Sequence, residues 1–172
     1  MAGRIDKRLK ELGIVLPKAA TSLGNYLPYV KTGSFVWSVQ APLVDGKPAF
    51  TGRVGAEVTL EQAQACARLV AINILGQLRQ ACDGDLDRVR RVVRLGGFIA
   101  VAPGFAGHSQ VMNGASDLMV EVFGEKGRHA RFALGLVSLP IEMTVNIEGV
   151  FEIGPPARKT TKTKPARRAR RR

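Results

Sequence analysis

The chain has 172 residues, 45% of them hydrophobic, which suits one domain with a sizeable core. Its net charge of +12 is uneven, because residues 155–172 hold nine of the 26 Lys and Arg residues and no acid. Residues 1–154 carry the other 17 basic side chains and all 14 acidic ones, a net charge of about +3. The composition therefore excludes a strongly basic body, and we expect one domain over residues 1–154 followed by a disordered basic tail.

Cysteine and histidine are too sparse to indicate a metal site. Cys66 and Cys82 fall at the two ends of one predicted helix, about 24 Å apart at about 1.5 Å per residue, which is too far for a disulfide. Neither His108 nor His129 has a Cys, His or Asp cluster at ligand spacing. The N-terminus has no apolar signal region, and no run reaches transmembrane length. We expect a cytoplasmic protein with no membrane association, no metal and no cofactor.

The first part of the chain predicts a short helix, an irregular segment and a β-hairpin. Residues 4–12 have apolar side chains at helical spacing. Residues 14–30 are interrupted by two prolines and are expected to be irregular. In residues 33–52, the pair Asp45-Gly46 predicts the turn of a β-hairpin.

Two helices and three strands are predicted after the hairpin. Thr59 and Gln62 match a capping box, so the longest helix begins after Thr59, and it ends at Asp83-Gly84. A strand, a second helix and two closing strands follow, at residues 88–102, 109–123, 131–138 and 143–152. We expect the two closing strands to pair with each other.

This order of elements predicts an α+β fold, with one sheet and two helices on a single face. The other face of the sheet needs a cover, and the strands at residues 88–102 and 143–152 are apolar on both sides. We therefore expect self-association through that face.

Several local motifs, in this order, resemble the RidA/YjgF (Rid) family, whose members are also labelled endoribonuclease L-PSP. The matching segments cover nearly all of residues 4–153 and are NYLPYVKTGSFVWSVQ (25–40), PLVDGKPAFTGRVG (42–55), LEQAQACARLVAINILGQL (60–78), MNGASDLMVEVFGE (112–125), GRHAR (127–131) and LP…VNIEGVFE (139–152). The resemblance implies a chorismate-mutase-like fold with one mixed sheet, a homotrimer, and ligand clefts between subunits. It also implies hydrolysis of reactive enamines or imines to a keto acid and ammonia.

The resemblance also assigns candidate site residues. Arg131 matches the arginine that binds the substrate carboxylate, and Tyr26, Ser38 and Asn113 match other pocket positions. A guanidinium suits this role because it presents a rigid fork to a carboxylate and keeps its charge. Read without the family, Arg131 is more often explained as a surface residue or as part of an internal ion pair.

This chain departs from the family pattern at the position of the water-activating glutamate. The family pattern VEVE or IEIE is Val145-Asn146-Ile147-Glu148 here, so Asn146 occupies that position. A carboxamide orients water but cannot accept its proton, so imine hydrolysis should be reduced or abolished. Glu148 faces the same side of the strand but lies about 7 Å further along, and we expect it to pair with an arginine.

Other departures affect the shape and the surroundings of the cleft. Val39 replaces a family glycine and Phe132 replaces a common serine, so a cleft that they face should be narrower and more apolar. A harmless substitution of a strand residue is an equal alternative for Val39. Arg128 and His129 could join a subunit contact or be solvated.

The basic tail is a separate candidate site. It contains Arg167, Arg168, Arg170, Arg171 and Arg172, which suit weak, salt-dependent and nonspecific contacts with nucleic-acid phosphates. An acidic protein surface, or no partner at all, is the alternative. Residues 1–154 lack the usual acid–base or metal constellation for RNA cleavage, so a ribonuclease activity is not supported.

Three functions follow from the sequence. The first is a Rid-like trimer that binds a small carboxylate at Arg131, with enamine or imine deamination impaired by Asn146. The second is a non-catalytic module that binds a small metabolite in the same cleft. The third is a protein that associates with nucleic acid through its tail.

Overall fold

The computed structural model describes residues 3–18 and 24–155. The five arginines proposed to contact nucleic acid, Arg167, Arg168, Arg170, Arg171 and Arg172, lie outside the described residues. The elements in chain order are α1 (Arg4–Glu11), β1 (Tyr29–Thr32), β2 (Phe35–Gln40), β3 (Leu43–Val44), β4 (Lys47–Pro48), α2 (Leu60–Ala81), η1 (Leu86–Arg88), β5 (Val89–Ala100), α3 (His108–Phe123), η2 (Gly124–Gly127), β6 (Ala130–Leu136), η3 (Pro140–Glu142) and β7 (Val145–Ile153).

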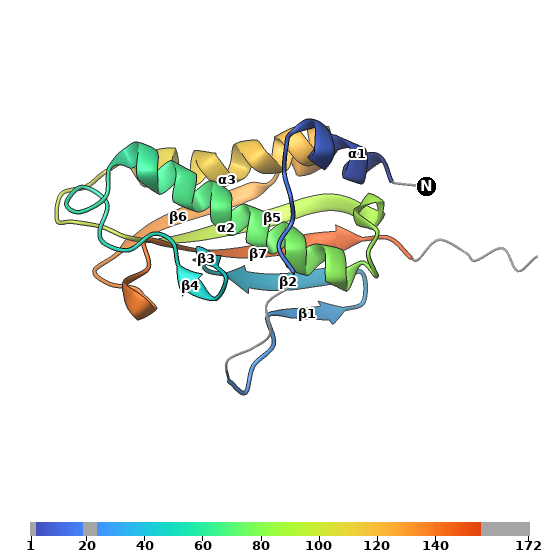
Figure 1. The fold of residues 1–172 in the computed structure, drawn as a ribbon, viewed down its shortest axis with the longest axis horizontal. Coiled ribbons are helices and arrows are strands. Elements are labelled where there is room, and N and C mark those ends of the chain that lie inside the picture. The colour runs from blue at the N-terminus through green and yellow to red at the C-terminus, as the bar shows by residue number, and fades with distance from the viewer. Residues whose placement is uncertain (1–2, 19–23, 156–172) are drawn as a thin grey trace, which may run out of the picture.

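The predicted capping box at the start of α2 is confirmed. The Thr59 side chain accepts a hydrogen bond from the Gln62 backbone N–H, and the Gln62 side chain accepts one from the Thr59 N–H. The helix has 22 residues, and most of its buried side chains are small or aliphatic. They pack against α3 and against the strands beneath, which fixes both long helices on one face of the sheet (Figure 1).

The sheet is mixed, as expected, but the two closing strands do not pair with each other. The five strands lie in the order β1-β2-β7-β5-β6, with β5 parallel to β6 and antiparallel to β7. The expected pairing of residues 131–138 with 143–152 is therefore wrong. Helix α3 connects β5 to β6 as a crossover between parallel strands, so β6 takes one side of β5 and β7 takes the other.

The predicted hairpin at residues 33–52 is also different from the observed one. Asp45 and Gly46 do form a tight turn, both with positive φ, but it joins only β3 and β4, which have two residues each. Strand β2 pairs instead with β1 and with β7. Strand β1 begins inside the segment expected to be irregular, directly after Pro28, the second of the two prolines on which that expectation was based.

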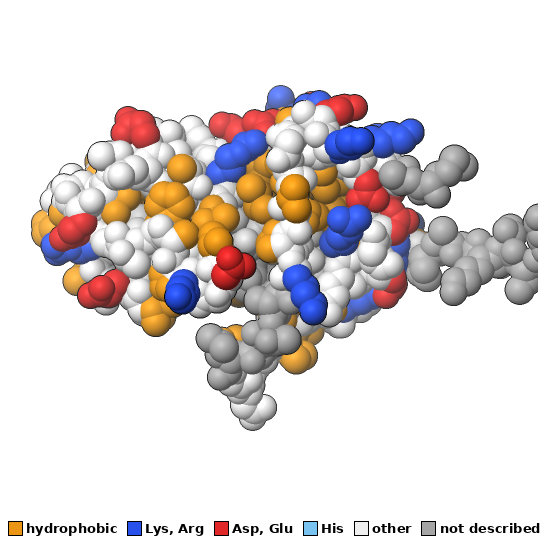
Figure 2. All heavy atoms as spheres, viewed as in Figure 1, with side chains coloured by type: hydrophobic (Ala, Val, Ile, Leu, Met, Phe, Trp, Pro, Cys, Tyr) orange, Lys and Arg blue, Asp and Glu red, His pale blue; other side chains and the backbone are white. Residues whose placement is uncertain are grey.

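Alternating side chains give the two faces of the sheet different characters. On β7, Val145, Ile147 and Phe151 are fully buried against the helices. The residues between them, including Asn146 and Glu148, face the other way. We call this second side the open face, because no helix of the described chain covers it (Figure 1). Figure 2 shows the helix-covered side, with charged side chains around its rim and apolar ones nearer the middle.

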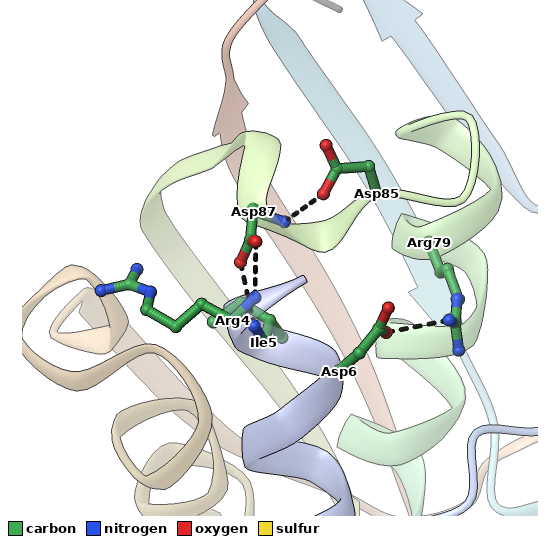
Figure 3. A network of polar contacts seen from close by, with 6 residues as sticks. All are labelled: Arg4, Ile5, Asp6, Arg79, Asp85 and Asp87. Atoms are coloured by element: carbon green, nitrogen blue, oxygen red, sulfur yellow. Dashed lines mark hydrogen bonds and ion pairs between the residues drawn. The ribbon is translucent and has the colours of Figure 1, made fainter. Parts of the chain in front are cut away.

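The short helix α1 is held at its start by a residue from far along the chain. The Asp87 carboxylate accepts hydrogen bonds from the backbone N–H groups of Arg4, at 2.7 Å, and Ile5, at 2.9 Å (Figure 3). An ion pair of 2.8 Å between Asp6 and Arg79 links α1 to α2. Asp87 therefore supplies the cap that Gly3, which precedes the helix, cannot provide.

Among residues 3–18 and 24–155, none of the helices combines the length and the apolar character needed to cross a membrane.

Candidate functional site

Arg131 lies near the start of β6, on the helix-covered side of the sheet. Its strand partner on β5 is Leu95, which is fully buried in the core. Its guanidinium bonds to α3: Nη1 donates to Asn113 Oδ1 and to Ser116 Oγ, each at 3.0 Å, and Nη2 donates to the Ser109 carbonyl at 3.2 Å. Helix α3 therefore fixes the plane of the guanidinium.

These contacts use three of the five N–H donors of Arg131. Among the described residues, the Nε–H and one N–H of Nη2 have no hydrogen-bond partner. Nε and Nη2 together form a two-donor edge that matches the two oxygens of a carboxylate. Arg131 is only partly buried, so this edge can receive a ligand.

Ser116 connects Arg131 to His129. His129 Nε2 lies 3.0 Å from Ser116 Oγ, and its Nδ1 lies 2.6 Å from the Gly127 carbonyl oxygen. The half-buried imidazole has a lowered pKa, mainly because of burial. The hydrogen bond to Gly127 opposes this lowering, and the positive charge of Arg131 adds to it. His129 is thus a hydrogen-bonded residue of this cluster and not a solvated one.

Sequence reasoning did not single out Ser109 and Ser116. Together with Asn113 they stand at i, i+4 and i+7 on α3, so they share one face of that helix. That spacing was the feature of the sequence that could have identified Ser109 and Ser116 as neighbours of Asn113. The partners of the guanidinium could have been found by projecting α3 as a helix and asking which polar residues lie beside Asn113.

Asn146 lies on the open face, opposite to Arg131. Its neighbour on β5 is Phe98, whereas Arg131 is in line with Leu95, three residues away, and an odd separation reverses the face. The Asn146 amide has one described contact, a donor contact of 3.7 Å to Met143 Sδ. Within one chain, the carboxylate-binding candidate and the water-activating position are on different sides of the sheet.

Glu148 also lies on the open face, and its carboxylate forms an ion pair with Arg94. The expectation that Glu148 pairs with an arginine is confirmed. The guanidinium of Arg94 in turn lies 5.7 Å from the centre of the Phe132 ring. Glu148 is therefore committed to a neighbour on its own sheet and is a poor substitute for the missing glutamate.

Phe132 and Val39 both lie on the open face with Asn146. The Phe132 ring packs edge-on against Phe98, with ring centres 5.6 Å apart, and it lies directly over Gly96. A side chain at Gly96 would overlap this ring, so the glycine makes room for the phenylalanine. Val39 is exposed and stands opposite Glu148. Asn146 therefore lies beside the aromatic pair Phe98 and Phe132, with the Arg94–Glu148 ion pair on the same face.

Tyr26 and Ser38 are far from Arg131 within the chain. Tyr26 is exposed in the loop before β1. Ser38 is buried on β2 and donates a hydrogen bond to the Pro28 carbonyl at 3.2 Å. Three strand spacings separate β2 from β6, or about 14 Å at about 4.8 Å each. Of the predicted pocket residues, the fold brings only Asn113 to Arg131.

The described residues include two thiols but no candidate metal cluster. Cys66 and Cys82 are both free and buried, and burial raises the pKa of Cys66 to about 12 and that of Cys82 to about 11. Both are therefore protonated and poorly nucleophilic at neutral pH. No group of three or more His, Cys, Asp or Glu side chains in residues 3–18 and 24–155 could hold a metal ion.

The fold and this cluster define an α+β protein in which the second long helix, α3, holds a partly buried arginine of strand β6. Residues 6–150 match the model of the family described as "YjgF/chorismate mutase-like, putative endoribonuclease". The chain therefore belongs to the YjgF/chorismate-mutase-like family.

Relatives of known sequence or structure support this membership. Protein TCP17 of Trypanosoma cruzi is 44% identical over 154 residues, covering 88% of this chain and 96% of that protein. The structure of Atu1372, a protein of unknown function from Agrobacterium tumefaciens, is 45% identical with a TM-score of 0.79, covering 87% of this chain and 91% of that one. A "putative endoribonuclease" structure from Shewanella oneidensis is 36% identical with a TM-score of 0.84, covering 88% of this chain and all of that one.

Proposed function

We propose that this protein binds a small carboxylate at Arg131. The observation that carries the proposal is the two-donor edge formed by Nε and Nη2, which stays unpaired among the described residues while α3 holds the rest of the guanidinium. Two parallel charge-assisted hydrogen bonds would bind a carboxylate more strongly and more specifically than a single cation.

We further propose that the cleft is completed by a neighbouring subunit of a homotrimer. Tyr26, Ser38 and Val39 lie near the β1–β2 edge of the sheet, and Arg131 lies at the β6 edge. A second copy of the chain would bring these two edges together. Exposed Trp37, Val39 and Leu134 on the open face favour such an assembly, because a monomer would leave this apolar surface in water.

Binding without efficient turnover is the favoured outcome at this site. Asn146 has no group that can accept a proton from water, and Glu148 is paired with Arg94. Enamine or imine deamination is the runner-up, and it requires a base that the described part of a single chain does not place beside Arg131. General acid–base help is typically worth about 10²–10⁴-fold in rate.

The binding proposal is tested by calorimetric titration with pyruvate and its uncharged ester, methyl pyruvate. Wild type should prefer pyruvate, and Arg131→Ala should weaken pyruvate binding at least about tenfold without affecting the ester. Arg128→Ala is the matched control, because Arg128 is three residues away, exposed, and paired with Glu125 at 3.2 Å. Equal binding of acid and ester by wild type would contradict the proposal.

The question of turnover needs a separate assay. An amino-acid oxidase can generate an imino acid in situ, and the appearance of keto acid is then followed with wild type, Asn146→Glu and Arg131→Ala. We expect wild type to match the enzyme-free rate and Asn146→Glu to exceed it by about 10²-fold. Fast conversion by wild type, lost in Arg131→Ala, would establish the deaminase instead.

A nucleic-acid role of the tail is a second candidate, favoured by its basic composition without any acid. Duplex DNA titrated at two salt concentrations should bind the full chain more tightly at low salt. A chain ending at Gly154 should lose this binding. Unchanged affinity after truncation would remove the candidate.

A further inference from the structure

We propose that Ser116 and His129 are positioning residues for carboxylate recognition, joined in one hydrogen-bonded chain that runs from the Gly127 carbonyl to the Arg131 guanidinium. The inference rests on the proposed binding of a carboxylate at Arg131 and adds the residues that orient the guanidinium. Neither residue needs to touch the ligand.

The direction of every hydrogen bond in this chain is fixed by chemistry. The Gly127 carbonyl can only accept, so His129 Nδ1 carries the proton in the 2.6 Å contact. In the neutral imidazole, Nε2 then accepts, and the Ser116 hydroxyl donates to it over 3.0 Å. The guanidinium can only donate, so the Ser116 oxygen accepts from Arg131 Nη1. The hydroxyl is thereby held in the one orientation that presents an acceptor to Arg131.

The far end of the chain is anchored in the backbone. Gly127 is buried against α3, and a Cβ at this position would overlap the backbone carbonyl of Met119. The Gly127 carbonyl therefore has a fixed position relative to α3, which also carries Ser116. His129 spans these two fixed points, and its ring is half-buried between them.

This anchoring affects binding because an arginine side chain is long and loses much rotamer freedom when it is ordered. Asn113 and the Ser109 carbonyl also hold the guanidinium, but both of these contacts are exposed to water. The contact with Ser116 is partly buried. Ser116 is thus the partner best protected from exchange with solvent, and it keeps Nη1 occupied while the Nε–Nη2 edge is left for the ligand.

Four variants test the inference in the full-length protein, again with pyruvate and methyl pyruvate as probes. Ser116→Ala and His129→Leu should each weaken pyruvate binding about five- to tenfold, roughly the net worth of one ordinary hydrogen bond, with no change for the ester. His129→Gln should restore binding to within about twofold, because its amide oxygen can accept from Ser116 as Nε2 does. His108→Gln is the control, since the other histidine is also half-buried but packs on Phe105.

A second measurement keeps the outcomes distinct. NMR of the Arg131 Nε–H group reports how freely the guanidinium rotates, whether or not a ligand binds. Rotation should be slow in wild type and His129→Gln, and fast in His129→Leu and Ser116→Ala. If wild type does not distinguish pyruvate from its ester but rotation follows this pattern, the proposed function fails and the positioning role stands. If His129→Leu leaves both rotation and pyruvate affinity unchanged, or if His129→Gln is as impaired as His129→Leu, the positioning role is overturned.

Discussion

The two faces of the same sheet differ in how complete they are within one chain. On the helix-covered face, α2 and α3 bury the strands, and side chains such as Ile147 and Phe151 have no exposed surface. On the open face, Trp37, Val39 and Leu134 are between 40% and 52% exposed. The helix-covered face has its full set of neighbours, and the open face does not.

The candidate site is divided between these faces. The helix-covered face holds Arg131 together with Asn113, Ser116 and His129. The hydrogen bonds among these residues involve only α3, η2, β6 and the residues between η2 and β6. Asn146 belongs to the open face. One chain therefore fixes the Arg131 guanidinium by itself, whereas the proposed neighbouring subunit would be needed to enclose Asn146 on the open face.

The largest expected effect comes from a charge on the open face. We expect Leu134→Glu, at a site on β6 that is 50% exposed, to dissociate the proposed trimer, because an unpaired carboxylate would be buried in the interface. Size-exclusion chromatography with light scattering would show the change in mass. Pyruvate binding should fall with it, since the neighbouring subunit no longer completes the cleft.

Val44→Glu is the matched control for this experiment. Val44 is 49% exposed, but it lies in the small β3–β4 sheet and not on the open face. This variant should keep the mass of the wild type. If both variants behave alike, or if wild type is already a monomer, the open face is not the assembly surface.

A smaller effect, a loss of stability, is expected from crowding the contact between α2 and α3 on the helix-covered face. A Cβ at Gly114 of α3 would overlap the backbone carbonyl of Gln64 on α2, so Gly114→Ala must push the two helices apart. We expect the free energy of unfolding to fall by about 1–3 kcal/mol in urea titrations. In an uncrowded helix the same change would gain up to about 1 kcal/mol, so the sign of the effect is diagnostic. Asp117→Ala, at an exposed position of the same helix, should change stability by less than about 0.5 kcal/mol.

The contrast between the faces also marks what the sequence could and could not predict. The capping box of α2, both long helices and the α+β class follow from local patterns in the sequence, and they are confirmed. Alternation within a strand is also a local pattern, so the sequence alone places Asn146 and Glu148 on the same side of their strand. These are all properties of residues close together in the chain.

Relations between strands could not be read in the same way. Pairing of β6 with β7 was the simplest expectation from their order, but β5 lies between them. Whether Arg131 and Asn146 share a face depends on the register of both strands against β5, and no local pattern encodes that register. Ser116 was missed because its role depends on Arg131 reaching α3 from another element.

The attachment of α1 to the rest of the fold should contribute less to the free energy of unfolding than the contact between α2 and α3. Asp87→Ala removes the carboxylate that accepts from the Arg4 and Ile5 amides, and we expect a loss of about 1 kcal/mol, as for other helix caps. Hydrogen exchange should become faster at these two amides and stay unchanged in the middle of α3. Asp87→Asn keeps an acceptor and should lie between Asp87→Ala and wild type. Uniformly faster exchange throughout the chain would mean that Asp87 supports the whole fold and not this cap.

The smallest expected effect is a pH dependence from His129. Because its pKa is lowered in the folded state, the unfolded chain binds a proton first, at about pH 6.5. The contribution of His129 to the stability of the folded state should therefore be complete above about pH 6.5. It should be lost as the pH falls from about 6.5 through the lower pKa of His129 in the folded state. The charged group that acts on the ring is Arg131 on β6, whose positive charge adds to the lowering of the pKa caused by burial.

Urea titrations of wild type and His129→Gln between pH 7.5 and pH 5 would isolate this contribution, since the carboxylates titrate alike in both. The wild type should lose more stability than His129→Gln across this range, and His108→Gln should follow the wild type. If stability falls in parallel with pH in all three proteins, protonation of His129 does not destabilise the helix-covered face. In that case the hydroxyl of Ser116 would accept from a charged imidazole and from Arg131 at the same time, and the neutral ring would not be needed to hold the anchor.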